Sequence, residues 1–225
     1  MQRVNKVVGY EAALAGLRDG ATMMIGGFGS SGLPDALIDA VLNHGATDLT
    51  VISNNAGYGN EGAAGLIAAG RVRKLVCSYP LTEGATAFRD AYRRGSVELE
   101  LVPQGTLVER IRCAGAGLGG FFCPVSAGTL LGAGKRVDVI NGVEHVLELP
   151  LAADFALLRA RIADRIGNLV YHLAGRNFNP VMATAARVVI AQVDAIVDAG
   201  ELDPERIDTP GIFVDRVVTS TGGRS

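Results

Sequence analysis

The residues best suited to chemistry in this 225-residue chain are seven consecutive positions rich in glycine: Gly26, Gly27, Phe28, Gly29, Ser30, Ser31 and Gly32. They follow the apolar run 23–25 and precede Pro34, a residue favoured in the first turn of a helix. A strand, a tight loop and a helix N-terminus in this order bring backbone N–H groups against a phosphate or acyl group. The pattern therefore predicts a strand over 22–25 followed by a binding loop.

Three neutral amide side chains follow other predicted strands. Asn54 and Asn55 come after the apolar run 49–53, and Gln104 comes after the run 97–102. Because the carboxyl ends of parallel strands meet at one edge of a sheet, we expect these amides near the glycine-rich loop. Neutral amides can stabilise a developing oxyanion without losing a proton. The alternative is that the asparagines are ordinary turn residues and Gln104 a solvated loop residue.

The same glycines also fit the spacing G-x-G-x-x-G, at Gly27, Gly29 and Gly32. A dinucleotide site needs an acidic residue about 20 positions on, at the carboxyl end of the second strand, to hold the ribose. Asn54 and Asn55 occupy that place, and Asp48 lies at the opposite end of the strand. The sequence therefore disfavours NAD or FAD binding.

The first 110 residues alternate between short apolar runs and segments with helical spacing. Strands are predicted over 22–25, 49–53, 74–78 and 97–102, and helices over 10–17, 34–44, 62–69 and 83–94. Continuously apolar strands separated by helices are typical of parallel sheets covered on both faces. We therefore predict an α/β fold, a three-layer open and mainly parallel sheet with helices on both faces.

The second half departs from this rhythm. Asn141-Gly142 is a strong signal for a hairpin over 137–147, and residues 155–161 and 169–171 predict a second hairpin. Residues 121–129 are expected to form a loop. A helix over 180–186 and strands over 188–193 and 212–217 complete the prediction. With no linker evident, we expect one domain over 1–225 with a frayed tail at 219–225.

Composition excludes several classes of function. A net charge of −2 without any basic run argues against nucleic-acid binding. The three cysteines, Cys77, Cys113 and Cys123, form no C-x-x-C pair and only three histidines accompany them, so no metal site is predicted. Isolated thiols and the lack of a signal segment or an 18-residue apolar run predict a cytoplasmic protein without membrane contact.

The chain resembles the A (alpha) subunit of family I coenzyme A transferases, of the 3-oxoacid and 3-oxoadipate type. The family signature, Asp-Gly before three apolar residues and Gly-Gly-Phe-x-x-x-Gly-x-Pro, is met at every defined position from Asp19 to Pro34. Further matches follow in order at 53–57, 102–107, 176–180, 200–205 and 209–214. The resemblance therefore covers nearly the whole chain.

The resemblance implies a ping-pong exchange through a glutamyl-CoA thioester. The nucleophilic glutamate of the family lies in a Ser-Glu-Asn-Gly motif of the B subunit, and this chain has no such tetrapeptide. The implied partner is therefore a B subunit, in an α2β2 heterotetramer that acts on acyl-CoA and small carboxylic acids. A coenzyme A thioester is a substrate here, and no tightly bound cofactor is implied.

The resemblance also assigns roles. Residues 26–32 match the CoA-binding loop, Gln104 matches a glutamine that orients the acyl or carboxylate group, and Asn54 and Asn55 would give polar support. Phe28 either packs or contacts substrate, and Arg176 either meets a carboxylate or ties down a loop.

Residues 77–80 resemble the 3-oxoadipate branch, which favours CoA transfer from succinyl-CoA to 3-oxoadipate, with acetoacetate next. Residues 123–127 depart from the family pattern, in a loop that bears on acyl preference if it lines the pocket. The alternative function is a phosphate-binding or sugar-phosphate isomerase-like protein, or a sensor, of related fold.

Overall fold

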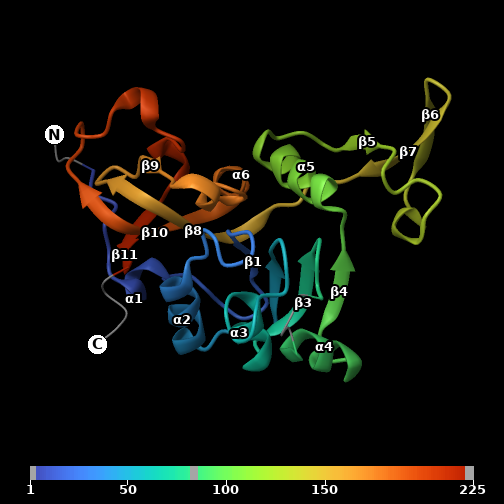
Figure 1. Cartoon of the computed structure of the whole chain (residues 1–225), viewed down its shortest axis with the longest axis horizontal. Helices are drawn as coiled ribbons and strands as arrows, with labels where there is room; N and C mark the ends of the chain where they lie inside the picture. The colour runs from blue at the N-terminus through green and yellow to red at the C-terminus, as the bar shows by residue number, and fades with distance from the viewer. Residues whose placement is uncertain (1–3, 82–85, 221–225) are drawn as a thin grey trace.

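An open sheet of parallel strands runs through the molecule in the computed structural model, which describes residues 4–81 and 86–220 (Figure 1). Its strands lie in the order β11-β10-β8-β1-β2-β3-β4, and each pairs in parallel with its neighbours. Their bounds are β1 Thr22–Ile25, β2 Leu49–Ile52, β3 Val72–Cys77, β4 Glu98–Leu101, β8 Ala153–Asp164, β10 Ala186–Val197 and β11 Arg216–Thr219. The predicted parallel sheet is confirmed.

Helices cover both faces of this sheet, as predicted. Neighbouring residues of a strand point to opposite faces, and Met23 and Met24 of β1 accordingly enter two different hydrophobic clusters. The helices on the Met23 face are α1 Tyr10–Ala13, α2 Asp35–His44, α3 Ala63–Ala68 and α4 Thr86–Arg93. Those on the Met24 face are α5 Gln104–Gly115 and α6 Asn179–Ala183.

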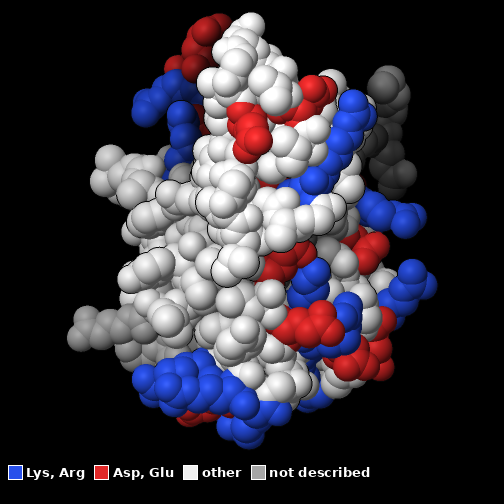
Figure 2. Space-filling model, turned by 90° about the vertical axis from the view of Figure 1, so that its right-hand side faces the viewer, with Lys and Arg blue, Asp and Glu red and all other residues white. Residues whose placement is uncertain are grey.

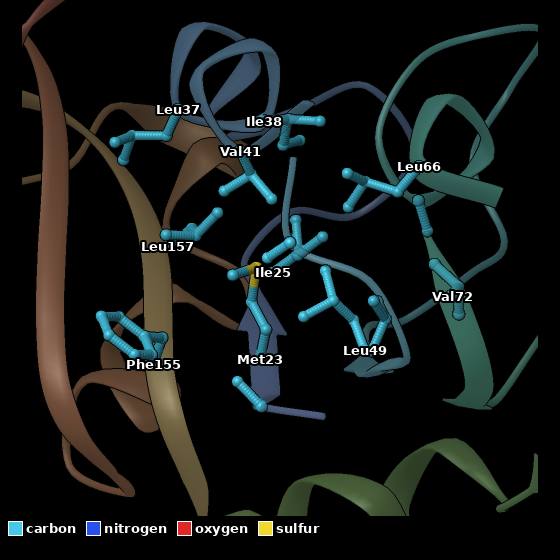
Figure 3. Packing of buried hydrophobic residues seen from close by; sticks show 14 of the residues in the cluster. Met23, Ile25, Leu37, Ile38, Val41, Leu49, Leu66, Val72, Phe155 and Leu157 are labelled. Carbon is cyan, nitrogen blue, oxygen red and sulfur yellow. The ribbon is translucent and has the colours of Figure 1, made fainter. Parts of the chain in front are cut away.

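The core on the first face shows why these segments form these elements. Met23 and Ile25 of β1 pack with Leu37 and Val41 of α2, four residues apart on one side of that helix (Figure 3). All four are at most 1% exposed. Gly45 caps the carboxyl end of α2, and its left-handed φ of 87° is favourable for glycine. Packing of this apolar stripe fixes where the chain leaves β1, and so where the glycine-rich loop lies.

A second, three-stranded antiparallel sheet projects from one end of the molecule (Figure 1). We call it the arm sheet; it consists of β5 Phe121–Cys123, β7 Val143–Glu148 and β6 Val137–Ile140. The hairpin predicted at Asn141-Gly142 is confirmed, since Ile140 pairs with Val143 and both turn residues have positive φ. The loop expected over 121–129 is wrong for its first three residues, because β7 pairs with them, Phe121 with Glu148 and Cys123 with Val146.

The second predicted hairpin joins β8 to β9 Leu169–Val170, which pair antiparallel. Asp164 closes the turn by accepting hydrogen bonds from the backbone N–H groups of Ile166 and Asn168. Strand β8 begins earlier than predicted because its first half pairs with β1 and β10 in the parallel sheet.

The last predicted strand, over 212–217, begins too early. Residues 211–213 form the 3-10 turn η4 Gly211–Phe213, and β11 starts at Arg216. The other 3-10 turns are η1 Leu130–Gly132, η2 Leu173–Gly175 and η3 Pro204–Arg206. No helix in the described residues has the length and apolar character needed to cross a bilayer. The tail predicted to fray over 219–225 begins two residues too early, because Thr219 of β11 pairs with Val193 and the Ser220 Oγ donates to the Val193 carbonyl at 2.9 Å. The rest of that tail, 221–225, lies outside the described residues.

Candidate active site

The predicted site residues lie where β1, β2 and β4 end, at the carboxyl edge of the parallel sheet. Residues 26–32 follow β1, and we call them the glycine loop. The loop is a tight reversal, because Phe28 and Ser31 exchange both backbone N–H···O bonds, at 3.0 and 3.1 Å. Phe28 at its tip is 52% exposed. Its side chain is therefore available to a ligand or a partner rather than packed in the core.

Two asparagines that sequence reasoning did not single out hold the glycine loop in place. The Asn177 Oδ1 accepts a hydrogen bond from the Gly27 N–H at 3.1 Å, and its Nδ2 donates to the Ser31 carbonyl at 2.9 Å. The fully buried Asn179 donates from Nδ2 to the Gly32 carbonyl at 3.1 Å. Both lie in the segment 176–180 that matched the family motif, and that match was the available signal.

Two positions of the glycine loop require glycine because residues 175–179 lie close to them. A Cβ on Gly26 would lie 2.0 Å from the Asn179 Oδ1, and a Cβ on Gly32 would lie 2.5 Å from the Gly175 carbonyl oxygen. Gly32 also has a φ of 70°, in the left-handed region. The glycine content of the loop is therefore explained in part by the asparagine segment beneath it.

Arg176, in the same segment, forms an ion pair with Asp208. Asp208 also accepts a hydrogen bond from the Tyr171 N–H at 2.8 Å. Of the two roles considered for Arg176, the geometry favours tying down the loop.

Asn54 connects the ends of three strands. Its Oδ1 accepts hydrogen bonds from the Gln104 Nε2 at 2.8 Å and from the Ser78 Oγ at 2.9 Å. Asn54 is only 5% exposed, and Ser78 follows directly after β3. Asn54 therefore holds the Gln104 amide in one orientation, with its Nε2 turned toward β2.

Gln104 is the first residue of α5, which corrects the expectation that Pro103, Gln104 and Gly105 form a loop. The structure places Pro103 at the N-cap, a position compatible with its fixed φ. Gln104 itself is exposed, and in the described part of the chain its Oε1 has no partner. A rigid helix start therefore presents an amide that is anchored on one side and free on the other.

Asn55 has a different role from Asn54. Its Oδ1 accepts from the Gly57 N–H at 2.8 Å, and its carbonyl accepts from the Ser53 Oγ at 2.6 Å. These are the bonds of a local turn, as in the alternative considered for this residue. Asn54 and Asn55 both line a cavity of about 10 Å³ with Gly27 and Gly29, so the asparagine turn and the glycine loop adjoin.

A larger cavity of about 420 Å³ lies beside Gln104. Phe121, Cys123 and Val125 contribute to its wall, so the segment that departs from the family pattern does line it. Glu109 also lines it, and its carboxylate is bonded by the Arg112 Nε at 2.8 Å.

Among the described residues, no Asp or Glu lines the small cavity between the glycine loop and the asparagine turn, and exposed Glu61 in the loop after β2 lies outside that lining. Glu148 of the arm sheet is 1% exposed, and its carboxylate pairs with the Lys135 Nζ at 2.6 Å. Burial raises the pKa of the Cys77 thiol to about 12, which keeps it protonated. Residues 4–81 and 86–220 contain no His, Cys, Asp and Glu group suited to a metal ion. A sugar-phosphate isomerase would need its own acid or base here.

Comparison with known proteins agrees with the residue pattern. The model of the family described as coenzyme A transferase matches residues 9–220. The A subunit of the 3-oxoadipate CoA-transferase of Pseudomonas putida is 56% identical over 222 residues, covering 97% of this chain and 95% of that protein. The corresponding Acinetobacter baylyi protein is 52% identical over 206 residues, covering 92% and 90%. The alpha subunit of the Escherichia coli acetate CoA-transferase is 44% identical, covering 96% and 97%.

Solved structures share the fold. Glutaconate coenzyme A-transferase from Acidaminococcus fermentans superposes with a TM-score of 0.85 at 23% identity, covering 95% of this chain and 75% of that one. An acyl-CoA transferase apoenzyme from Escherichia coli O157:H7 superposes with a TM-score of 0.86 at 21% identity. It matches 100% of this chain, which spans 48% of that longer protein. At these identities the likeness concerns the fold alone.

Proposed function

Because this chain belongs to the coenzyme A transferase family, as the A subunit of a succinyl-CoA:3-oxoacid enzyme, we propose that it completes a site for CoA transfer to 3-oxoadipate. The observation that carries the proposal is the amide of Gln104, which Asn54 holds, next to a small cavity between Asn54 and the glycine loop that no Asp or Glu of the described residues lines. Such a site has donors for an oxyanion and lacks a nucleophile. A second chain must therefore supply the attacking group.

The reaction we propose has two covalent stages. A glutamate carboxylate from the B subunit first attacks the thioester carbonyl of succinyl-CoA and expels the CoA thiolate, which leaves a succinyl-glutamyl anhydride. The thiolate then attacks the glutamyl carbonyl and releases succinate, which leaves a glutamyl-CoA thioester. The carboxylate of 3-oxoadipate reverses these steps. Each stage retains the energy of the thioester in a covalent bond.

The residues of this chain act on the charge that develops in those steps. Each attack turns a carbonyl oxygen into an oxyanion, which needs hydrogen-bond donors already aimed at it. One N–H of the Gln104 Nε2 bonds Asn54, and we assign the other to the oxyanion. The glycine loop contributes backbone N–H groups and the close approach that its glycines allow.

The identities to relatives support the choice of acceptor. The two 3-oxoadipate subunits are 56% and 52% identical to this chain, whereas the succinyl-CoA:3-ketoacid subunits from Xanthomonas campestris and Helicobacter pylori are 46% and 40% identical. We assign the acyl chain of the acceptor to the cavity of about 420 Å³ beside Gln104.

The proposed B partner needs a surface on which to dock, and we place part of it on the arm sheet, in an α2β2 assembly. Val137, Val139 and Val143 of that sheet are each more than half exposed. Charged residues of both signs are mixed around a wide uncharged area on the face of the molecule seen in Figure 2. Exposed apolar side chains that lie close together are typical of protein contacts.

Assay of the chain alone and co-expressed with its B subunit tests the proposal. CoA transfer from succinyl-CoA to 3-oxoadipate, and separately to acetoacetate, is measured as formation of the new thioester. We expect activity only in the pair, with the higher kcat/KM for 3-oxoadipate. Transferase activity of the lone chain would contradict the divided site, and a preference for acetoacetate would contradict the acceptor.

A further inference from the structure

A separate cavity of about 330 Å³ lies at the opposite edge of the parallel sheet from the glycine loop. Its wall includes Asp154 and Phe155 near the start of β8, and Arg187 and Val188 near the start of β10. The strands run parallel, so this is the edge where they begin, whereas the candidate active site lies where they end. The two sites are therefore on different sides of the molecule.

Three arginines from distant parts of the chain converge on this cavity: Arg18 ahead of β1, Arg187 in β10 and Arg216 in β11. We call it the arginine cavity. Asp154 is the one acidic residue in its wall, and the Asp154 Oδ2 accepts a hydrogen bond from the Thr22 N–H at 3.0 Å. Formal charges in the wall thus sum to two positive units.

These arginines are not neutralised by ion pairs in the described residues. The guanidinium groups of Arg18 and Arg187 have neither an ion pair nor a hydrogen bond there. Asp19 and Asp215, next to Arg18 and Arg216 in the chain, are not among the residues that line the cavity. The Asp19 Oδ1 accepts from the Thr47 N–H, and the Asp215 Oδ2 accepts from the Val189 N–H. Arg18 and Arg187 are exposed and Arg216 is half-buried. A concave surface lined by charges of one sign focuses the electrostatic potential and raises the local concentration of the opposite ion, here an anion.

Hydrogen bonds to the backbone hold the Arg216 side chain in place at the wall of the arginine cavity. Its Nη1 donates to the carbonyls of Ala13 and Ala15 at 2.7 and 2.9 Å, at the carboxyl end of α1. In the described residues its Nε and Nη2 have no partner, so two nitrogens of a held guanidinium remain to donate. A guanidinium fork matches phosphate oxygens, and prior fixation reduces the entropy lost on binding.

We propose that the arginine cavity binds a small molecule carrying a multiply charged phosphoryl group, at a site separate from the transferase centre. A volume of about 330 Å³ is of the size of a small-ligand site. Each of the three guanidinium groups supplies charge-assisted N–H donors, and the anion removes their mutual repulsion.

The direct test titrates inorganic pyrophosphate into the chain assembled with its B subunit, by calorimetry in a buffer free of phosphate and sulfate. The double variant Arg18→Gln/Arg187→Gln removes the two unpaired cations. The matched control is Arg93→Gln/Arg94→Gln, which removes the same charge from two exposed arginines outside the cavity. Melting temperatures without ligand establish that both variants are folded.

We expect saturable binding that weakens about a hundredfold in the first variant, at about tenfold for each arginine lost, and by no more than about twofold in the control. Transferase activity of the first variant should stay unchanged, and saturating CoA should not displace pyrophosphate. Failure of the wild-type protein to bind, or equal binding by both double variants, would overturn the proposal. Displacement by CoA would do the same, because the phosphoryl groups would then be those of the transferase substrate. Activity is measured on the same samples, so this outcome is independent of the proposed function.

Discussion

The contact between Asn54 and Gln104 allows a quantitative test of how the oxyanion donor is positioned. Truncation of Gln104 to alanine removes the proposed donor, and loss of one oxyanion donor costs about 100-fold or more in kcat. Truncation of Asn54 leaves the donor but removes the acceptor that holds it at 2.8 Å. One lost hydrogen bond of about 1.4 kcal/mol corresponds to about a tenfold loss in kcat. Because Asn54 acts through Gln104, the double variant should be no slower than Gln104→Ala alone.

The assay is a double-mutant cycle on the assembled enzyme, with kcat and KM for succinyl-CoA measured for the wild type, both single variants and the double variant. Buried Asn54 also bonds Ser78, so Asn54→Ala should lower the melting temperature, whereas Gln104→Ala, at an exposed position, should not. Measuring kcat of all four proteins below the lowest of their melting temperatures separates the loss of activity from the loss of stability. Additive losses in kcat, or a Gln104→Ala enzyme with wild-type kcat, would refute the reasoning.

Three further predictions concern stability and reactivity. Gly26→Ala should lower the melting temperature and raise KM for succinyl-CoA, because its Cβ would lie 2.0 Å from the Asn179 Oδ1; an unchanged enzyme would show that the loop can shift. Burial alone would raise the pKa of Glu100, but hydrogen bonds and charge from a neighbouring arginine and lysine lower it below its usual 4.5. A lowered pKa in the folded state stabilises the protein above the unfolded value and loses this effect as pH falls through the folded value. Urea unfolding should therefore show Glu100→Gln less stable than wild type at neutral pH and equal to it in strong acid; a constant difference would contradict this. Because burial raises the pKa of Cys77 to about 12, iodoacetamide at pH 8 should modify half-buried Cys123 first, as read by peptide mass spectrometry; equal labelling would contradict it.

Short-range patterns predicted much of the fold. The alternation of apolar runs with helical spacing was sufficient to place the strands β1 to β4 and the helices on the Met23 face, because each element satisfies its backbone locally or along a neighbouring strand. The helix predicted over 10–17 was too long, since α1 ends at Ala13. The hairpin at Asn141-Gly142 was equally local. Errors arose where the partner was distant: β5 depends on β7, and the extra length of β8 comes from pairing with β1 and β10. Gln104 was assigned to a loop because Pro103 and Gly105 are common in turns, yet proline also suits the start of a helix.

The candidate site also has features that the sequence predicted and contacts that only the tertiary structure decided. Residue types alone predicted a glycine loop and neutral amides at one edge of a parallel sheet, since strand direction and chemical type can both be read from neighbouring residues. Only the tertiary structure decided that Asn54 bonds Gln104, 50 residues away, and that Asn177 holds Gly27, 150 residues away. It likewise brought the three arginines of the arginine cavity together. Such contacts depend on the order and register of strands in the sheet, which are set by packing over the whole core, so no local pattern contains them.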